Sequence, residues 1–120
     1  MKESHALTKR AQYVLVYQQG KVWIDSLLVM KALPNGLSLS RYGFSVTKKV
    51  GKAVQRNRLK RVLREIMRLQ VLKPGWDIVF IARRRAVAAD FHQLERAVTE
   101  LLGQAKLLEG SSETISAGVN

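Results

Sequence analysis

Nine lysine and arginine side chains lie between Lys48 and Arg68, in the run KKVGKAVQRNRLKRVLREIMR, and Glu65 is the only acid among them. Cationic side chains bind phosphate oxygens, and arginine can do so through two parallel hydrogen bonds. An amide such as Asn57 can bond a phosphate, a sugar or a base edge. The segment therefore indicates binding of a polyanion, and nucleic acid is the obvious partner.

The spacing of this run predicts an amphipathic helix from about Ala53 to Gln70. At roughly 100° of rotation per residue, one face collects the apolar residues Leu59, Val62, Leu63 and Ile66. The opposite face collects Asn57, Lys60, Arg61, Arg64 and Arg68. Such a helix can pack on a core and still present a cationic surface. The alternative is an ordinary solvated face, which leaves the near-absence of acids unexplained.

A basic loop, Lys48–Lys52, leads into this helix. Free backbone N–H groups and the helix dipole favour an anion at a helix N-terminus, and Gly51 permits close approach of the backbone. A P-loop for nucleotides is excluded, because Ala53 follows Gly51-Lys52 and Val46 occupies the position of the first glycine. The alternative is a solvated lysine loop.

Two tyrosines, Tyr13 and Tyr17, are four residues apart on a predicted helix and face the same way. Stacking of an unpaired base on an aromatic ring contributes roughly 1–3 kcal/mol, but spacing alone favours core packing for this pair. The run Arg83-Arg84-Arg85 follows a predicted buried strand. It fits either added phosphate contacts or a surface turn.

No catalytic or metal-binding residues are predicted. The chain has no cysteine, its two histidines are far apart in sequence, and its nine acids are dispersed. A two-metal nuclease site needs clustered carboxylates, and no Ser/His/Asp arrangement can be argued. The sequence thus offers binding chemistry without visible catalytic chemistry.

The bulk properties fit one small basic domain. The chain has 120 residues, 47% of them hydrophobic, and a formal net charge of +12 with a pI of about 10.6. No apolar run approaches the roughly 20 residues that span a bilayer, and the N-terminal residues lack the apolar core of a signal peptide. We expect a cytoplasmic nucleic-acid binder, although many ribosomal proteins share these properties.

The remaining patterns predict an α+β domain over residues 1–109 and a disordered tail over residues 110–120. The expected elements are a helix over 9–19 capped by Thr8 and ended by Gly20, a strand over 21–33 with a break at 25–26, a turn at 34–36, strands over 37–47 and 76–82, and a helix from Asp90. The strands that flank the basic helix are expected to pair in parallel. On the first of them, Tyr42 and Phe44 should share one face and Gly43 and Ser45 the other.

The run from Arg41 to Glu65, RYGFSVTKKVGKAVQRNRLKRVLRE, resembles the signature of the protein subunit of bacterial ribonuclease P. That family has a strand ending in a Gly-Phe-Ser-Val-Ser-Lys-Lys-like run, followed by an Arg-Asn-Arg helix. The resemblance extends from about Leu7 to about Leu108. Tyr13 replaces a usual Phe and Thr47 replaces a commoner Ser.

The resemblance implies an α–β sandwich with a small mixed sheet, three helices and a left-handed strand–helix–strand crossover, like domain 2 of ribosomal protein S5. It implies an accessory subunit of a ribonucleoprotein endonuclease that removes the 5′ leader of precursor tRNA. The partners would be ribonuclease P RNA and precursor tRNA, and the sequence indicates no protein partner and no membrane. The RNA would carry the chemistry with bound magnesium, so the protein alone would bind no cofactor.

The family's RNA-contacting set maps onto Lys48, Lys49, Lys52, Arg56, Asn57, Arg58, Lys60, Arg61 and Arg64, and the basic face adds Arg68. The resemblance makes Tyr13, Tyr17, Phe44 and Ser45 candidates for a cleft that holds the single-stranded leader, which reverses the packing preference for the two tyrosines.

Three rival functions remain open at this point. A ribosomal or other structural RNA-binding protein fits the charge and size equally, and only the ordered signature argues against it. A protein-only nuclease would need clustered acids or a histidine pair. A DNA-binding helical module is disfavoured because the basic helix lies inside a strand–helix–strand unit.

Overall fold

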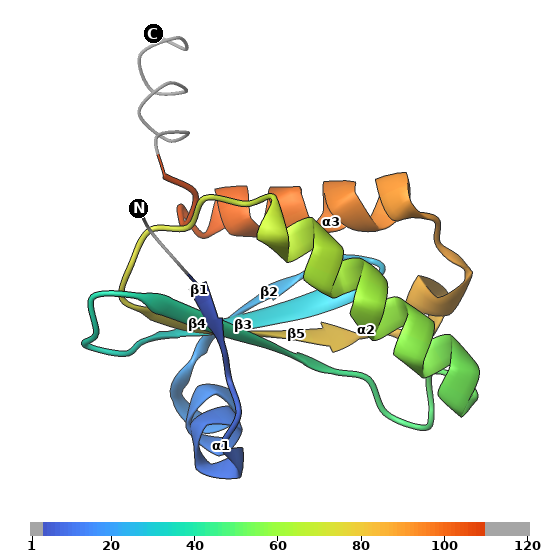
Figure 1. The fold of residues 1–120 in the computed structure, drawn as a ribbon, viewed down its shortest axis with the longest axis horizontal. Helices are drawn as coiled ribbons and strands as arrows, with labels where there is room; N and C mark the ends of the chain where they lie inside the picture. Colours follow the sequence, from blue (N-terminus) through green and yellow to red (C-terminus); the bar gives the residue numbers. More distant parts are fainter. Residues whose placement is uncertain (1–3, 110–120) are drawn as a thin grey trace, which may run out of the picture.

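The computed structural model describes residues 4–109 and builds them into a five-stranded mixed sheet with helices on both faces (Figure 1). The strands are β1 (Ser4–Ala6), β2 (Lys21–Ile24), β3 (Leu28–Pro34), β4 (Ser40–Ser45) and β5 (Trp76–Ala82). The helices are α1 (Arg10–Gln19), α2 (Ala53–Arg68), the short 3₁₀ helix η1 (Arg84–Ala88) and α3 (Phe91–Gln104). The strand order is β1-β4-β5-β3-β2.

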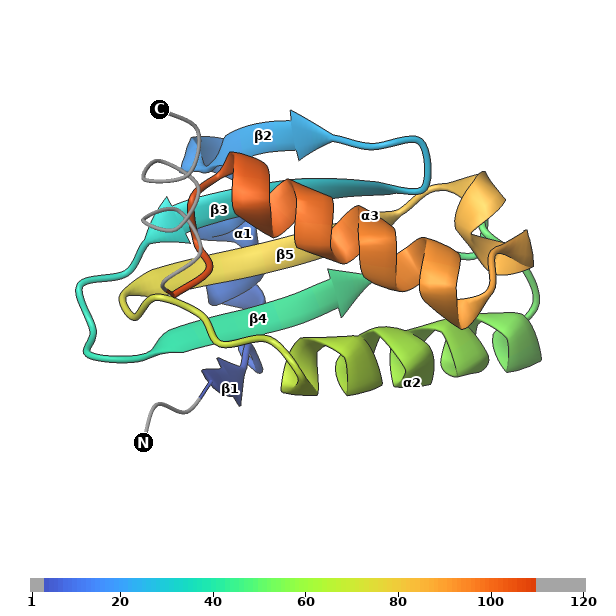
Figure 2. The ribbon, with the colours of Figure 1, turned by 90° about the horizontal axis from the view of Figure 1, so that it is seen from above.

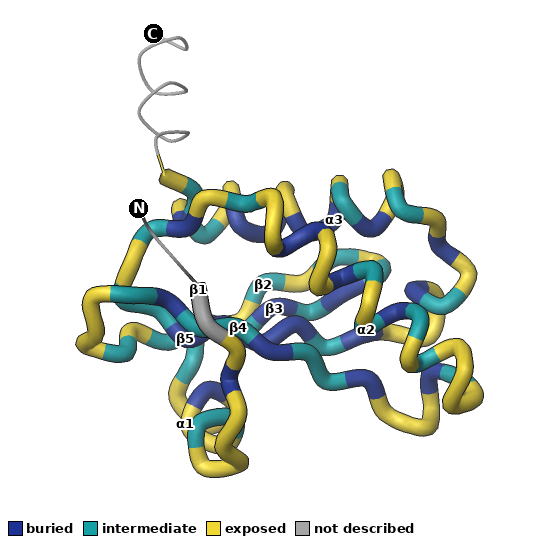
Figure 3. The backbone as a smooth tube through the Cα atoms, viewed as in Figure 1, coloured by how far each residue is buried: buried dark blue, intermediate teal, exposed yellow. Residues whose placement is uncertain are grey.

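Two layers of apolar side chains hold the sheet between its helices. The larger cluster lies under α2 and α3, and its fully buried members include Leu28, Met30, Leu59, Leu63, Ile66, Ile78, Phe80, Leu94 and Leu102. On the other face, α1 places Val16 in a small cluster with Leu7 and Val79. Figure 3 shows the buried strands between exposed helix surfaces. Alternation along β5 explains both clusters, since Val79 and Phe80 point to opposite faces.

The passage from β4 through α2 to β5 is a left-handed crossover. β4 and β5 are neighbours and pair in parallel, from Arg41 opposite Asp77 to Ser45 opposite Ile81. Figure 2 views the sheet from the side that α2 covers, and with β4 pointing upward β5 lies to its left. Such connections are right-handed in about 98% of cases, so a left-handed crossover is a rare feature that distinguishes this fold from most α/β folds. It confirms the α+β fold and the parallel pairing expected from the sequence.

The strongest sequence patterns are found where they were expected. β5 spans the predicted strand over 76–82. Asp90 caps α3: the Gln93 N–H donates to Asp90 Oδ1 at 2.8 Å, and the Asp90 N–H donates to Gln93 Oε1 at 2.9 Å. This reciprocal pair is a capping box, and α3 begins directly after Asp90, where the sequence predicted a helix.

Several boundaries differ from the prediction for local reasons. Thr8 does not cap the first helix, because Gln12 Oε1 accepts the N–H groups of both Thr8 (3.2 Å) and Lys9 (3.1 Å) and the helix begins at Arg10. The predicted break at 25–26 is confirmed, since Asp25 Oδ2 accepts the Leu27 N–H in a tight turn between β2 and β3. β4 begins at Ser40, later than predicted, because the Leu37 N–H donates to Asn35 Oδ1 at 2.8 Å and so belongs to the turn.

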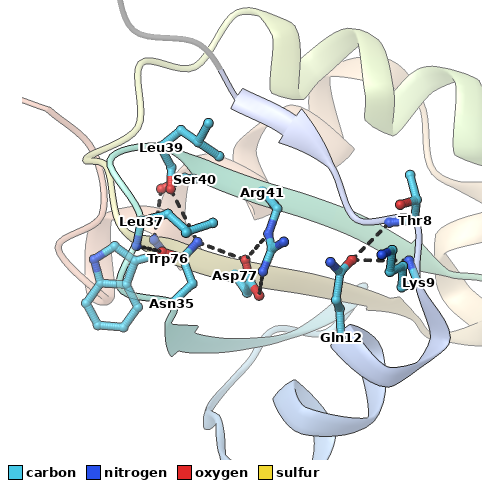
Figure 4. A network of polar contacts seen from close by, with 10 residues as sticks. All are labelled: Thr8, Lys9, Gln12, Asn35, Leu37, Leu39, Ser40, Arg41, Trp76 and Asp77. Atoms are coloured by element: carbon cyan, nitrogen blue, oxygen red, sulfur yellow. Dashed lines mark hydrogen bonds and ion pairs between the residues drawn. The ribbon is translucent and has the colours of Figure 1, made fainter.

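A polar network joins the start of β4 to β5 (Figure 4). Arg41 and Asn35 both donate to Asp77, which is only 6% exposed. The Ser40 hydroxyl, 2% exposed, donates to the Lys73 carbonyl and accepts the Trp76 N–H. These bonds satisfy buried polar groups at the point where the loops before β4 and β5 meet.

Strand β1 was not predicted. It pairs in parallel with β4 from Ser4 opposite Ser40 to Ala6 opposite Tyr42, and the Leu7 N–H then donates to the Tyr42 carbonyl at 2.8 Å. The pairing ends there, before β4 does. No helix among residues 4–109 is long and apolar enough to cross a membrane. The expected tail over 110–120 lies outside the described residues.

Candidate nucleic-acid interface

Helix α2 packs one side on the core and directs its charge outward. Leu59, Leu63 and Ile66 of the predicted apolar face are buried, Val62 is half-buried, and Met67 is buried beside them. Seven of the ten predicted RNA-binding residues are exposed: Lys48, Lys49, Lys52, Asn57, Arg61, Arg64 and Arg68. Glu65 forms an ion pair with Arg68 at 3.3 Å, and both side chains are more than half exposed. The outward surface is therefore strongly cationic.

The three other predicted residues are half-buried and lie at the margins of this surface. Arg56 turns back onto the preceding loop, where its Nε donates to the Gly51 carbonyl at 3.1 Å. This bond, together with a bond from the Lys52 N–H to Gln55 Oε1 at 2.8 Å, fixes the loop against the helix N-terminus. Arg56 thus has a structural contact that its place in the sequence did not reveal.

Lys60 and Arg58 lie on opposite flanks of α2, because two residues span about 200° of rotation. Lys60 and Arg64, four residues apart, line a hollow beside the edge of β4. Arg58 lies on the flank directed away from that hollow. The helix therefore presents two basic surfaces, the flank at β4 and the outer face that carries Arg61.

Tyr13 and Tyr17 neighbour each other on α1, with ring centroids 6.5 Å apart. Tyr17 is 37% exposed, and Lys31 of β3 lies over its ring at 5.5 Å and donates to its carbonyl. Tyr13 is half-buried, and its hydroxyl donates to the Leu7 carbonyl at 3.4 Å. Burial raises the pKa of Tyr13 and so does the neighbouring Tyr17, while a backbone hydrogen bond from Phe44 lowers it.

Tyr13 also covers the backbone of β4. A Cβ atom at Gly43 would collide with the Tyr13 hydroxyl and ring. Gly43 therefore allows α1 to lie close to the strand, at the point where β1 leaves it.

The predicted cleft residues do not all face one space. Phe44 stacks on Phe80 at 6.2 Å between ring centroids and contacts Tyr42 at 5.7 Å, on the side of the sheet that α2 covers. Ser45 follows it in the strand and points to the α1 side. The structure thus places Ser45 on the α1 side of the sheet and Phe44 on the α2 side, and Phe44 and Tyr13 both line the hollow at the edge of β4.

The arginines after β5 are arranged around the β2–β3 turn. The Arg83 N–H donates to the Leu27 carbonyl and its Nη1 to the Asp25 carbonyl, both at 3.0 Å. Arg83, Arg84 and Arg85 line a hollow with Ser26. The segment thus joins β5 to η1 at the surface and exposes three cations. Within residues 4–109 no group of three or more His, Asp or Glu side chains is placed to hold a metal ion.

Comparison with known proteins assigns this arrangement to a family. The family model described as Ribonuclease P matches residues 1–106. A ribonuclease P protein component from Dehalococcoides mccartyi is 52% identical over 117 residues, which cover 98% of each chain. The chain belongs to the ribonuclease P protein component family. A further family member, from Caldanaerobacter subterraneus, is 44% identical over 86% of this chain and 90% of its own.

Solved structures of ribonuclease P proteins share the fold. The RNase P protein from Thermotoga maritima aligns with a TM-score of 0.76 at 34% identity, over 83% of this chain and 96% of its own. A Staphylococcus aureus RNase P protein mutant, described as having defective mRNA degradation activity, aligns with a TM-score of 0.81 at 29% identity, over 87% and 90% of the two chains. These matches confirm the expected family and α+β fold. This chain is a protein subunit of the ribonuclease P holoenzyme.

Proposed function

We propose that α2 and its basic loop bind the RNA subunit of ribonuclease P, and that the α1 side of the sheet binds the 5′ leader of precursor tRNA. The observation that carries the proposal is the charge of α2 and the loop before it, where nine Lys and Arg residues between Lys48 and Arg68 are accompanied by one acid. A surface of this charge neutralises phosphates and releases their counterions, which favours RNA binding.

The two sides of the sheet carry different side chains and therefore suit different RNA ligands. The α2 side offers charge from one rigid helix, which suits the phosphates of a folded RNA. The α1 side offers the exposed ring of Tyr17 with Lys31 beside it, which suits a single strand with unpaired bases. A leader contact separates precursor from product, because mature tRNA has no leader.

The RNA subunit supplies catalysis in this proposal, with magnesium bound by the RNA. The protein lowers repulsion between two polyanions and so reduces the cation concentration that the reaction needs. The holoenzyme would cleave precursor tRNA in the bacterial cytoplasm and leave a 5′ phosphate on the mature tRNA.

Salt-dependent binding to a bacterial ribonuclease P RNA tests the α2 surface. Arg61→Gln removes one exposed charge from α2, and Arg96→Gln removes one exposed charge from α3. For Arg61→Gln we expect weaker binding and a slope of log K against log salt that is shallower by about 0.9, the value for one lost phosphate contact. Arg96→Gln should match the wild type. If both variants have the same affinity and the same salt dependence, the proposal that α2 binds this RNA is wrong.

A further inference from the structure

A hollow opens at the edge of β4, where β1 ends and α2 crosses. Its volume is about 300 Å³, and its lining includes Leu7, Tyr13, Tyr42, Phe44, Lys60 and Arg64. This volume is at the lower end of the range for small-ligand sites, roughly 300–1,000 Å³. Three segments far apart in sequence thus meet there: the residues around α1, strand β4 and helix α2.

The wall of the hollow has two chemically distinct parts. Tyr42 and Phe44 provide aromatic surface, with ring centroids 5.7 Å apart, and Phe44 is supported from behind by Phe80. Phe80 is fully buried, so the aromatic wall is anchored in the core. Lys60 and Arg64 provide two positive charges from one flank of α2. No ion pair with an acid within residues 4–109 occupies either cation.

The position of the hollow is set by the end of the β1–β4 pairing. β1 stops at Ala6, and the Tyr13 hydroxyl donates to the next carbonyl, that of Leu7. The chain then turns away into α1, so β1 does not cover the rest of the β4 edge. Tyr13 packs closely against Gly43 and forms this boundary of the hollow.

We propose that this hollow holds one unpaired nucleotide of an RNA strand, with its base against Tyr42 and its phosphate between Lys60 and Arg64. An aromatic surface recognises the face of a base, and paired cations recognise the adjacent phosphate. The inference rests on the proposed RNA-binding function and adds to it a defined nucleotide site. The nucleotide can come from the RNA subunit or from the leader of precursor tRNA, and the two sources are separable by experiment.

The experiment measures two affinities with the full chain. One arm titrates the protein into a bacterial ribonuclease P RNA, and the other titrates the assembled holoenzyme with precursor tRNA and with mature tRNA. Tyr42→Leu keeps an apolar side chain and removes the ring, while Tyr42→Phe keeps the ring. Phe91→Leu is the matched control, because Phe91 is also half-buried at the rim of the main core and lies on α3.

Tyr42→Leu should weaken binding by about five- to 150-fold in one arm, which corresponds to the loss of one stacked base. Tyr42→Phe and Phe91→Leu should bind like the wild type. A loss with the RNA subunit assigns the nucleotide to that RNA, and a loss with precursor tRNA alone assigns it to the leader. Wild-type affinity of Tyr42→Leu in both arms would overturn the proposal.

Two further measurements do not depend on the folding of Tyr42→Leu. The double variant Lys60→Gln, Arg64→Gln should make the salt dependence shallower by about 0.7, the value for one phosphate of a single strand. In the wild type, bound RNA should protect Lys60 from acylation by an N-hydroxysuccinimide ester severalfold more than it protects the exposed Lys106. Equal protection of the two lysines would contradict a nucleotide in the hollow.

The failure of this site is distinguishable from failure of the proposed function. If Arg61→Gln weakens RNA binding while Tyr42→Leu and the Lys60→Gln, Arg64→Gln variant do not, α2 binds RNA but the hollow holds no nucleotide. If none of these variants alters RNA binding, the proposed function fails as well.

Discussion

Arg41 and Asp77 form two hydrogen bonds across the parallel strands β4 and β5, at 2.8 Å from Nε to Oδ1 and 2.7 Å from Nη2 to Oδ2. The pair lies at the start of the left-handed crossover, and Asn35 Nδ2 donates to the same carboxylate at 2.9 Å. The hydrogen bond to Asp77 raises the pKa of Arg41, against a smaller lowering by burial. Arg41 is therefore charged throughout the usual pH range.

Arg41→Met should destabilise the protein by about 2–3 kcal/mol, because it leaves the buried Asp77 carboxylate with Asn35 as its remaining side-chain partner. Urea unfolding measures this loss. The double variant Arg41→Met, Asp77→Leu should lose less stability than the sum of the losses in the two single variants, which identifies the two residues as coupled. The control is Arg68→Gln, whose exposed ion pair with Glu65 should contribute less than about 1 kcal/mol. Additive losses for Arg41 and Asp77 would contradict the coupling.

Gly43→Ala should destabilise the protein by about 1–3 kcal/mol, because its Cβ would displace Tyr13 from the β4 backbone. In a Tyr13→Ala background the same substitution should cost clearly less. Gly103→Ala in α3 is the matched control: its Cβ meets no atom of the described residues within 4 Å, and helix propensity favours Ala there. If thermal unfolding of Gly43→Ala resembles that of Gly103→Ala, the close packing of Tyr13 is wrong.

The phenol of Tyr13 should ionise above pH 10, because burial and the neighbouring Tyr17 raise its pKa in the folded state. A raised pKa means that folding favours the neutral phenol. The contribution of this group to stability is therefore full below pH 10 and is lost as the pH rises through the folded-state pKa. The difference between absorbance titrations of the wild type and Tyr13→Phe isolates this step. A midpoint below 10 would contradict the buried setting of the hydroxyl.

Tyr17→Ala should weaken binding of precursor tRNA to the holoenzyme by about fivefold or more, through loss of one stacking surface. Binding of mature tRNA should be unchanged. Tyr17 is a better test of the leader site than Tyr13, because the Tyr13 side chain also stabilises the fold through its hydrogen bond to Leu7 and its packing on Gly43. Val14→Ala is the control, since Val14 is similarly exposed on α1 but has no ring. Equal losses for precursor and mature tRNA would assign Tyr17 a structural role.

The elements that the sequence predicted well are those whose own residues determine them. α2 and α3 have apolar residues at helical spacing, and Asp90 with Gln93 marks where α3 begins. β5 is apolar apart from Asp77, and it is buried from Asp77 to Phe80. In each case the local pattern and the tertiary environment agree.

The features that the sequence missed depend on contacts between distant segments. β1 is three residues long and has no apolar alternation, and its strand geometry comes from pairing with β4. Arg41, Asn35 and Asp77 meet only when the loops before β4 and β5 come together. The handedness of the crossover has no local signal either, and only the family resemblance indicated it.

The candidate site divides in the same way. The spacing of the basic residues predicted a cationic face on α2. How these residues are divided between the outer face and the flank at β4 depends on how the helix lies on the sheet. Alternation along β4 placed Phe44 and Ser45 on opposite faces, yet the family resemblance grouped them in one cleft. The hollow that joins Tyr42 to Lys60 and Arg64 could not be predicted, because it exists only where β1 stops short of the end of β4.

The most direct test of the central claim is cleavage of 5′-labelled precursor tRNA at low magnesium, with the protein and a bacterial ribonuclease P RNA together and each alone. The account predicts cleavage at the mature 5′ end only in the mixture, and loss of this stimulation when two α2 charges are neutralised by Arg58→Gln with Arg61→Gln. Absence of stimulation by a folded protein, with an RNA that is active at high magnesium, would contradict the account, as would cleavage by the protein alone.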